Sequence, residues 1–337
     1  MRSIRSQFSS AFSLIELLVS MTLLSLMMLL VSSMLGEIEE GWGRVRSGTV
    51  EFRDARNAFE TIANRLSQAR IDTYWDYEMD QGIPINYRKS SHLHFVAADG
   101  EDFVPTSLVE ATGSSVFFEA PFGMSREQDL KGLASLLNGW GYFAGFGSDA
   151  EWQPQFARDR LDEKYRFRLF EYHLPTERLA LHSEEQLTGY QWITDHLESR
   201  NVSVLAENVI LFLIHPVHST DPTEAHELAE EYRFDSRAYD LSPGDSNADR
   251  ARHEVPPIIQ MTMVAVAEAD FSRYQEGNPT GIPDEFRIEE IAPFSKSIDF
   301  EKDLQALEEH LQENRIDYRV FSTAIGLRNA KWTNQNF

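Results

Sequence analysis

The chain has 337 residues, of which 54 are acidic and 31 are basic, giving a formal net charge of −23. Nucleic-acid binding depends on clustered Lys and Arg, so this balance argues against a nucleic-acid partner and favours solubility instead. There is no cysteine, which excludes both a disulfide framework and a thiolate metal site.

Residues 12–35 form an apolar stretch in which Glu16 is the only ionisable side chain. As a helix this stretch is long enough to cover a hydrocarbon core of roughly 30 Å. Arg2 and Arg5 precede it and favour a cytoplasmic N-terminus. The sequence therefore predicts a single-pass inner-membrane protein with an extracytoplasmic head.

Glu16 needs a partner, because a charge inside an apolar span costs on the order of 2.5–3.5 kcal/mol. If a peptidase cut between Ala11 and Phe12, the new α-amine would lie on Phe12, four residues before Glu16. In a stack of similar helices, the amine of one subunit would then neutralise the carboxylate of its neighbour. Glu16 is therefore the predicted assembly contact.

Ala11 followed by Phe12-Ser13-Leu14-Ile15-Glu16 resembles the prepilin cleavage and methylation motif of type IV pilins and type II secretion pseudopilins. Ala11 stands where that family usually has Gly. The resemblance implies a leader at residues 1–11, cleavage by a prepilin peptidase and N-methylation of Phe12. It also implies other pilin-like subunits, the inner-membrane assembly machinery and membrane lipid as partners.

Two other interpretations of residues 12–35 are a secretory signal peptide and a plain single-span anchor. A signal peptide has a shorter, uncharged apolar part of about 7–15 residues, followed by a small-residue cleavage site. Val31-Ser32-Ser33 matches such a site weakly. The prepilin interpretation is preferred because it explains both Phe12 and Glu16.

A second helical pattern continues the first through residues 36–70, with glycines at 36, 41 and 43 as a point where the helix is weakest. Apolar residues recur at steps of three, four or seven and form one stripe, which we expect to pack on a sheet. The stripe consists of Val45, Phe52, Ala55, Phe59, Ile62, Leu66 and Ala69. This extracytoplasmic part of the N-terminal helix also matches the pilin layout.

The head, residues 71–337, is expected to be one domain, since no Pro/Ser-rich linker divides it. Its β-branched and aromatic runs predict strands at residues 92–98, 115–120, 165–174, 202–217 and 258–267. Residues 124–160 and 219–254 are expected to be insertions or surface loops. The predicted fold class is α+β, with a long N-terminal transmembrane and amphipathic helix packed on an antiparallel β-sheet head, as in pilins.

The C-terminal region predicts a helix at residues 298–314 and a strand at 316–327. With residues 204–209, the ending Arg328-Asn329-Ala330-Lys331-Trp332 resembles the C-type prepilin-like protein of the Verru_Chthon cassette. The helix after the span resembles the J-type minor pseudopilins of type II secretion. These resemblances imply a minor subunit with a large head.

Candidate metal sites are few. His215 and His218, with Asp221 or Glu224, have a spacing that zinc accepts, but loop-edge histidines are the preferred interpretation. Asp235, Asp240, Asp245 and Asp249 form a carboxylate series, as in some calcium-binding pseudopilin loops by resemblance, yet their spacing fits no defined calcium loop. No catalytic residue, metal or cofactor is predicted.

The predicted function is a minor pilin-like subunit that assembles through its N-terminal helix into a type IV pilus or a periplasmic pseudopilus. The alternatives are a membrane-anchored ligand-binding protein and an unrecognised hydrolase. For ligand binding, the aromatic residues between Trp140 and Phe146, with Trp152, are the expected surface. The pilus or secretion system and its cargo stay open.

Overall fold

The computed structural model describes residues 14–153, 156, 162–179, 189–217, 231–237 and 252–331. In the N-terminal helix, the side chains at 14, 16 and 29–51 lie outside this description. The chain divides into two compact units, Met1–Val50 and Glu51–Phe337. The helix α1, Leu14–Leu66, contributes residues to both units, which are described separately.

In the first unit, α1 carries apolar side chains that are between 52 and 72% exposed. They occupy nearly every position from 15 to 28, so they cover all sides of the helix rather than one stripe. They are Ile15, Leu17, Leu18, Val19, Met21, Leu23, Leu24, Leu26, Met27 and Met28. Within this unit nothing among the described residues buries them.

The second unit contains a nine-stranded sheet in the order β11-β10-β8-β4-β5-β6-β7, with β3 pairing β4 and β9. All its pairings are antiparallel except for one parallel bridge, between Gly113 of β4 and Phe212 of β8. The strands are β3 (Phe95–Asp99), β4 (Glu110–Pro121), β5 (Leu137–Ser148), β6 (Tyr165–Leu174), β7 (Val202–Glu207), β8 (Val209–Val217), β9 (Phe234–Asp235), β10 (Ile258–Val266) and β11 (Tyr318–Gly326).

A separate two-stranded hairpin and several short helices complete this unit. The hairpin consists of β1 (Tyr74–Asp80) and β2 (Ile83–Ser90). The helices are α2 (Gly100–Phe103), α4 (Gln191–Thr194), α6 (Glu268–Gln275), α7 (Ile288–Ile291) and α8 (Phe300–Glu313), with 3-10 turns at η1 (Gln128–Leu130), η2 (Thr176–Arg178), η3 (Ser199–Asn201), η4 (Asp284–Phe286) and η5 (Ser297–Asp299).

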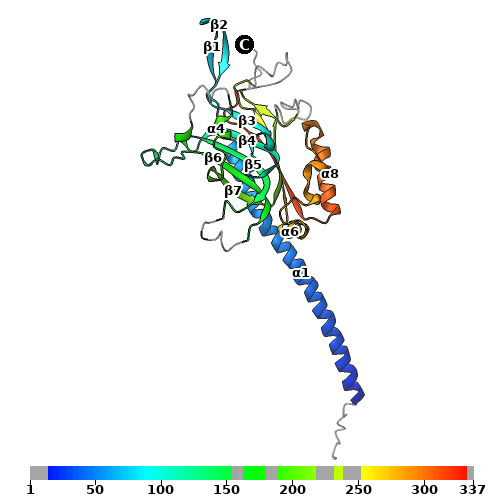
Figure 1. Cartoon of the computed structure of the whole chain (residues 1–337). Coiled ribbons are helices and arrows are strands. Elements are labelled where there is room, and N and C mark those ends of the chain that lie inside the picture. Colours follow the sequence, from blue (N-terminus) through cyan, green and yellow to red (C-terminus); the bar gives the residue numbers. More distant parts are fainter. Residues whose placement is uncertain are drawn as a thin grey trace, which may run out of the picture. The chain divides into compact units, whose positions relative to one another are not determined.

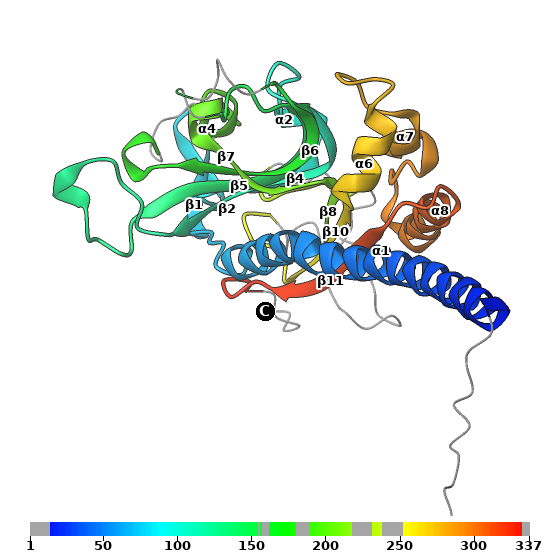
Figure 2. The ribbon, with the colours of Figure 1, turned by 90° about the horizontal axis from the view of Figure 1, so that it is seen from below.

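Three hydrophobic cores hold the second unit together. The C-terminal part of α1, through Phe59, Ile62 and Leu66, packs on one face of the sheet. On the opposite face of β8 and β10, α6, α7 and α8 enclose a second core (Figure 2). The curled strands β4 to β7 surround a third core, into which α4 inserts Trp192 and Ile193. Neighbouring residues alternate between cores, as in Phe117 and Phe118 of β4, because successive side chains of a strand point to opposite faces.

A polar cluster fastens the last turn of α1 to the sheet. Arg65 forms an ion pair with Glu171 of β6, and its guanidinium lies 4.7 Å from the centroid of the Trp140 ring. The indole of Trp140 and the hydroxyl of Tyr142 each donate to the same Glu171 oxygen at 3.1 Å. The carboxylate is thus neutralised and hydrogen-bonded where its side chain is only 12% exposed.

We expect Arg65→Ala to lower the free energy of unfolding by about 2 kcal/mol, because it leaves the largely buried Glu171 carboxylate without its cation. Arg56→Ala is the matched control on the same helix, since Arg56 pairs with Glu60 on an exposed surface. The control should cost no more than about 0.5 kcal/mol in urea unfolding. Equal effects of the two variants would contradict this role of Arg65.

This architecture corrects the predicted fold class. The second unit is β-rich, and its large curled sheet is mixed rather than antiparallel, because the strands on the two sides of the β4–β8 junction meet in parallel. No helix in the described residues is both long and apolar enough to cross a membrane, for which about 20 consecutive apolar residues are needed. The α+β pilin-like fold with a transmembrane helix at residues 12–35 was therefore wrong, and so was the single-pass inner-membrane location with an extracytoplasmic head.

Several individual elements were predicted correctly. The strand at 165–174 is β6, the run at 258–267 contains β10, and the C-terminal helix and strand are α8 and β11. The predicted apolar stripe is buried from Ala55 to Leu66 of α1, and Ala69, which follows the helix, is buried too. The run at 202–217 is two strands, β7 and β8, because Asn208 between them adopts a φ of 59°. Residues 124–160 are not only loop, since β5 lies within them.

Candidate functional site

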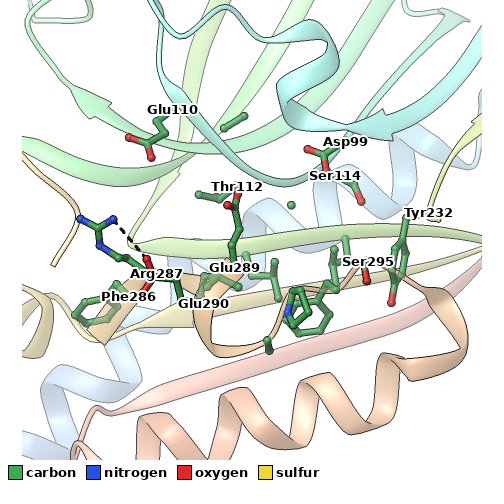
Figure 3. Close-up of a pocket in the computed structure, with 18 of the residues that line it drawn as sticks. Asp99, Glu110, Thr112, Ser114, Tyr232, Phe286, Arg287, Glu289, Glu290 and Ser295 are labelled. Carbon is green, nitrogen blue, oxygen red and sulfur yellow. Dashed lines mark ion pairs between the residues drawn. The ribbon is translucent and has the colours of Figure 1, made fainter. Parts of the chain in front are cut away.

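The candidate site is a cavity of about 660 Å³ in the second unit, where the two parts of the sheet diverge. Its lining comes from the edge of β4, from β8, from residues 231–233 and from the segment 281–295 that contains η4 and α7. Figure 3 shows Glu110, Thr112 and Ser114 on the β4 side, across from Glu289 and Ser295. The volume lies within the range of roughly 300–1,000 Å³ that is typical of small-molecule pockets.

Apolar side chains form part of the cavity wall, among them Leu211, Leu213, Ile282, Phe286 and Phe294. Except for Ile282, which is partly buried, all of them are buried members of the core that α6, α7 and α8 cover. The inner wall of the cavity is thus formed by residues of a hydrophobic core, and its rim is polar. A ligand with an apolar part would fit such a wall.

Charged groups at the rim are mostly carboxylates. Asp99, Glu110, Glu231, Glu289 and Glu290 line the cavity together with Arg233 and Arg287. Both arginines are engaged: Arg233 Nη2 lies 2.9 Å from Asp102 Oδ2, and Arg287 Nε lies 3.0 Å from Asp284 Oδ1. Burial raises the pKa of the neighbouring Glu101, and the nearby carboxylates of Glu289 and Asp99 raise it further.

Hydroxyl side chains also line the cavity. Nucleophilic catalysis by Ser or Thr requires a general base within hydrogen-bond reach. Ser114, Ser295 and Thr112 line the cavity, but the described lining contains no histidine or lysine. The only groups of the described lining that could act as a base toward these hydroxyls are its carboxylates.

A buried histidine and aspartate lie elsewhere, between β3 and β9. His94 Nε2 is 2.7 Å from Asp235 Oδ1, and the Tyr190 hydroxyl donates to Asp235 Oδ2 at 2.5 Å. Burial opposes ionisation of Asp235, but the hydrogen bonds from His94 and Tyr190 outweigh it and hold the carboxyl pKa well below its usual range. Burial lowers the pKa of His94.

The hydrogen bonds of His94 fix its tautomer. The Trp192 indole N–H donates to His94 Nδ1 at 3.3 Å, so Nδ1 is the acceptor and the Nε2 proton points to Asp235. In a Ser-His-Asp triad the second ring nitrogen faces the nucleophile. Here the indole of Trp192 occupies that place, and the His94 side chain is only 2% exposed. The pair thus borders the third core through Trp192.

The residues that the sequence singled out are distributed as follows. Ala11, Phe12, His218, Asp221, Glu224, Asp240, Asp245 and Asp249 lie outside the described residues. Glu16 lies in α1, but its side chain is likewise outside the description. His215 is a buried residue of β8 whose ring packs against Tyr232, and Asp235 holds His94. In the described part of the chain, no group of three His, Asp or Glu is placed to hold a metal.

The aromatic residues expected as a ligand surface are interior. Trp140 and Phe146 belong to β5 and are buried, as are Tyr142 and Phe143 between them. Trp152 is partly buried against the core inside the curled strands. The pocket itself was missed, because its lining comes from five separated segments with no motif in any of them.

Comparisons of this chain with protein-family models, with curated proteins and with solved structures find no match.

Proposed function

We propose that this chain is a pilin-like structural subunit that enters a fibre by packing its N-terminal helix against the helices of similar subunits. The observation that carries the proposal is the all-round apolar surface of α1 between Ile15 and Met28. A helix that is apolar on every side needs to be covered on every side. Neighbouring helices of the same kind provide such a cover, and the Ala11-Phe12 motif supports that choice.

The apolar surface explains attraction between helices but not their register, which is the role proposed for Glu16. After cleavage between Ala11 and Phe12, the Phe12 amine of one subunit and the Glu16 carboxylate of the next neutralise each other. A pair of opposite charges in apolar surroundings is costly when either member is missing, so it selects one register. Prepilin peptidase and other pilin-like subunits are the partners in this proposal.

The proposed role is not enzymatic. His94 and Asp235 are hydrogen-bonded to each other, and their remaining polar atoms bond to Trp192 and Tyr190. The described lining of the cavity contains no histidine that could act as a general base. These observations favour a structural subunit over a hydrolase.

The experiment replaces Glu16 by Gln, which keeps the size of the side chain and removes its charge, with Ser20→Ala as the control on the same helix. We expect Glu16→Gln to reduce co-purification with other pilin-like subunits at least about tenfold, because it strands the partner's amine. Protein level and melting temperature should not change. Mass analysis of the N-terminal peptide should give a chain that begins at an N-methylated Phe12.

Undiminished co-purification of Glu16→Gln would remove the assembly contact from the proposal. A mature chain that still begins at Met1 would overturn the processing step.

Ligand binding is a second candidate, favoured by the 660 Å³ cavity with its apolar wall and carboxylate rim. The two candidates are separable, since the assembly surface lies in Met1–Val50 and the cavity in Glu51–Phe337. Leu213→Trp, which fills the cavity wall, should abolish any small-molecule binding detected by NMR and leave co-purification unchanged.

A further inference from the structure

The hairpin β1–β2 belongs neither to the nine-stranded sheet nor to any of the three hydrophobic cores. Its two strands pair with each other and, among the described residues, with no other strand. Figure 1 shows it standing apart from the nine-stranded sheet. A hairpin of two strands has marginal stability by itself, and none of its side chains belongs to one of the three hydrophobic cores of the described residues.

One face of the hairpin is aromatic and exposed. Trp75, Tyr77 and Tyr87 are 68, 51 and 61% exposed. Tyr77 lies opposite Tyr87 with ring centroids 4.9 Å apart, and Trp75 shares their face because it lies two residues from Tyr77. These three side chains present roughly 350 Å² to solvent, which is comparable with the largest apolar patch on a typical monomer. Further exposed apolar residues of the hairpin are Met79, Ile83 and Ile85.

The other face of β1 is acidic. Asp76 and Glu78 alternate with the aromatic residues, and Asp80 ends the strand. On β2 the residues opposite them are Arg88 and Asn86. The β1 strand thus has an apolar face and an anionic face. Of the two carboxylates Asp76 and Glu78, only Asp76 lies opposite a cation on β2, Arg88, because Glu78 lies opposite the amide side chain of Asn86.

The two edges of the hairpin differ. On β2, Pro84 lacks an N–H and the register shifts beside Ile85; both features hinder strand addition. The β1 strand has neither proline nor lysine. The amide of Tyr77 donates to its own neighbour, Asp76 Oδ1, at 2.8 Å, as the amide of Tyr87 does to Asn86 Oδ1 at 2.9 Å.

These local bonds show the direction of the amides. Tyr77 and Tyr87 lie opposite each other, and each N–H donates to a side chain of its own strand rather than across the hairpin. They therefore form a non-hydrogen-bonded pair, in which both N–H groups point away from the partner strand. The N–H of Trp75, two residues away, has the same direction. An added strand would replace the local bond of Tyr77 by a ladder bond and would release the Asp76 carboxylate for a cation.

We propose that the free edge of β1 is a docking site for an extended segment of another protein, in which apolar side chains alternate with Lys or Arg. Strand addition supplies main-chain hydrogen bonds, and alternate side chains supply specificity. The apolar residues of the partner lie beside Trp75 and Tyr77, and its cations lie beside Asp76 and Glu78. This inference goes beyond the assembly role of α1 and does not depend on it.

A second copy of this chain is not the occupant. If two β1 edges paired, Asp76, Glu78 and Asp80 of each copy would face the same acidic strand, and like charges on paired strands repel. Pairing of β1 with the β2 edge of another copy meets Pro84 and the register shift. The net charge of −23 adds a general repulsion between copies.

The test uses the purified full-length chain and a fluorescent ten-residue peptide in which Lys alternates with Val and Tyr. We expect saturable binding in fluorescence anisotropy. We also expect the peptide to slow hydrogen exchange at the outward amides of Trp75 and Tyr77, compared with the free protein. The amides of Asp76 and Glu78 should be slowed less. The control peptides have the same composition with all Lys residues grouped, or Glu in place of Lys. Neither control should bind.

Two protein variants separate the apolar and the charge contributions. Tyr77→Ser should weaken binding about tenfold or more, as expected for an aromatic anchor, whereas Leu133→Ser, at an equally exposed apolar site in another loop, should not. Asp76→Lys with Glu78→Lys should reverse the preference, so that the Glu peptide binds and the Lys peptide does not. This reversal is not produced by loss of folding.

Binding of the grouped peptide as tight as that of the alternating one would overturn strand addition. Equal binding of the Glu peptide to the unchanged protein would overturn the charge complementarity. Self-association that Tyr77→Ser abolishes would show that a second copy, rather than a basic segment, occupies the edge. Absence of peptide binding together with unchanged exchange at Trp75 and Tyr77 would also overturn the proposal.

Discussion

Replacing Gly113 by valine is expected to lower the free energy of unfolding by about 4 kcal/mol or more, the range of single substitutions with a severe structural cause. Gly113 has a φ of 74°, which a β-branched residue rarely adopts. A Cβ atom there would lie 2.5 Å from the carbonyl oxygen of Phe212 and 3.0 Å from Leu211 Cδ1. Because Gly113 forms the parallel bridge between β4 and β8, the clash separates the two parts of the sheet.

Gly326→Val is the matched control for this prediction. Gly326 also lies in a strand, β11, but its φ is ordinary and a Cβ atom there meets nothing within 4 Å. We expect a change within about 1 kcal/mol, since valine favours strands. Urea unfolding followed by circular dichroism measures both variants. If Gly113→Val were as stable as Gly326→Val, the junction would not depend on the absence of a side chain.

The strands that were predicted correctly have the amino-acid composition that is typical of buried strands. β6 is rich in aromatic residues and β10 in β-branched residues and methionine, and both are central strands with neighbours on two sides. Such runs are typical of buried strands. The helix α8 was predicted from its stripe, and Leu307 and Leu311 of that stripe are buried as expected.

β5 was missed because its glycines are typical of a loop. A Cβ atom at Gly141 would lie 2.3 Å from Phe117 Cδ1, and one at Gly145 would lie 2.8 Å from Val109 Cγ2. These glycines therefore make room for side chains that come from neighbouring segments. Local composition gives no sign of such a requirement, since it arises only when β4 and β5 pair.

The candidate sites depend on contacts that are distant in the sequence. His94 and Asp235 are separated by 141 positions, and Asp235 was grouped instead with nearby acidic residues. The apolar surface of α1 was evident from composition, because it lies within one helix. The exposure of Trp75 and Tyr87 could not be predicted from composition. Aromatic residues of a strand are usually covered by a second layer of helices or strands, which this hairpin lacks among the described residues.

Glu119→Gln is expected to stabilise the protein at alkaline pH. Glu119 lies on β4, is 1% exposed, and accepts a hydrogen bond from the His94 amide at 2.6 Å. Burial raises the carboxyl pKa from 4.5 to about 8, even though the Arg237 cation acts in the opposite direction. The folded state therefore retains a proton that the unfolded state loses, and stability falls as the pH rises from about 4.5 to about 8. Gln keeps the acceptor oxygen and cannot ionise.

The measured quantity is the difference in unfolding free energy between Glu119→Gln and the unchanged protein, taken from pH 5 to pH 9. The difference is needed because His253, whose pKa burial lowers to about 4, removes stability from both proteins as the pH falls below about 6.5. We expect the advantage of the variant to grow by about 4 kcal/mol over this range. Glu110→Gln, at an exposed position of the same strand, should show no such growth. An advantage that does not change with pH would mean that Glu119 is ionised in the folded protein throughout, with Arg237 as its counter-charge.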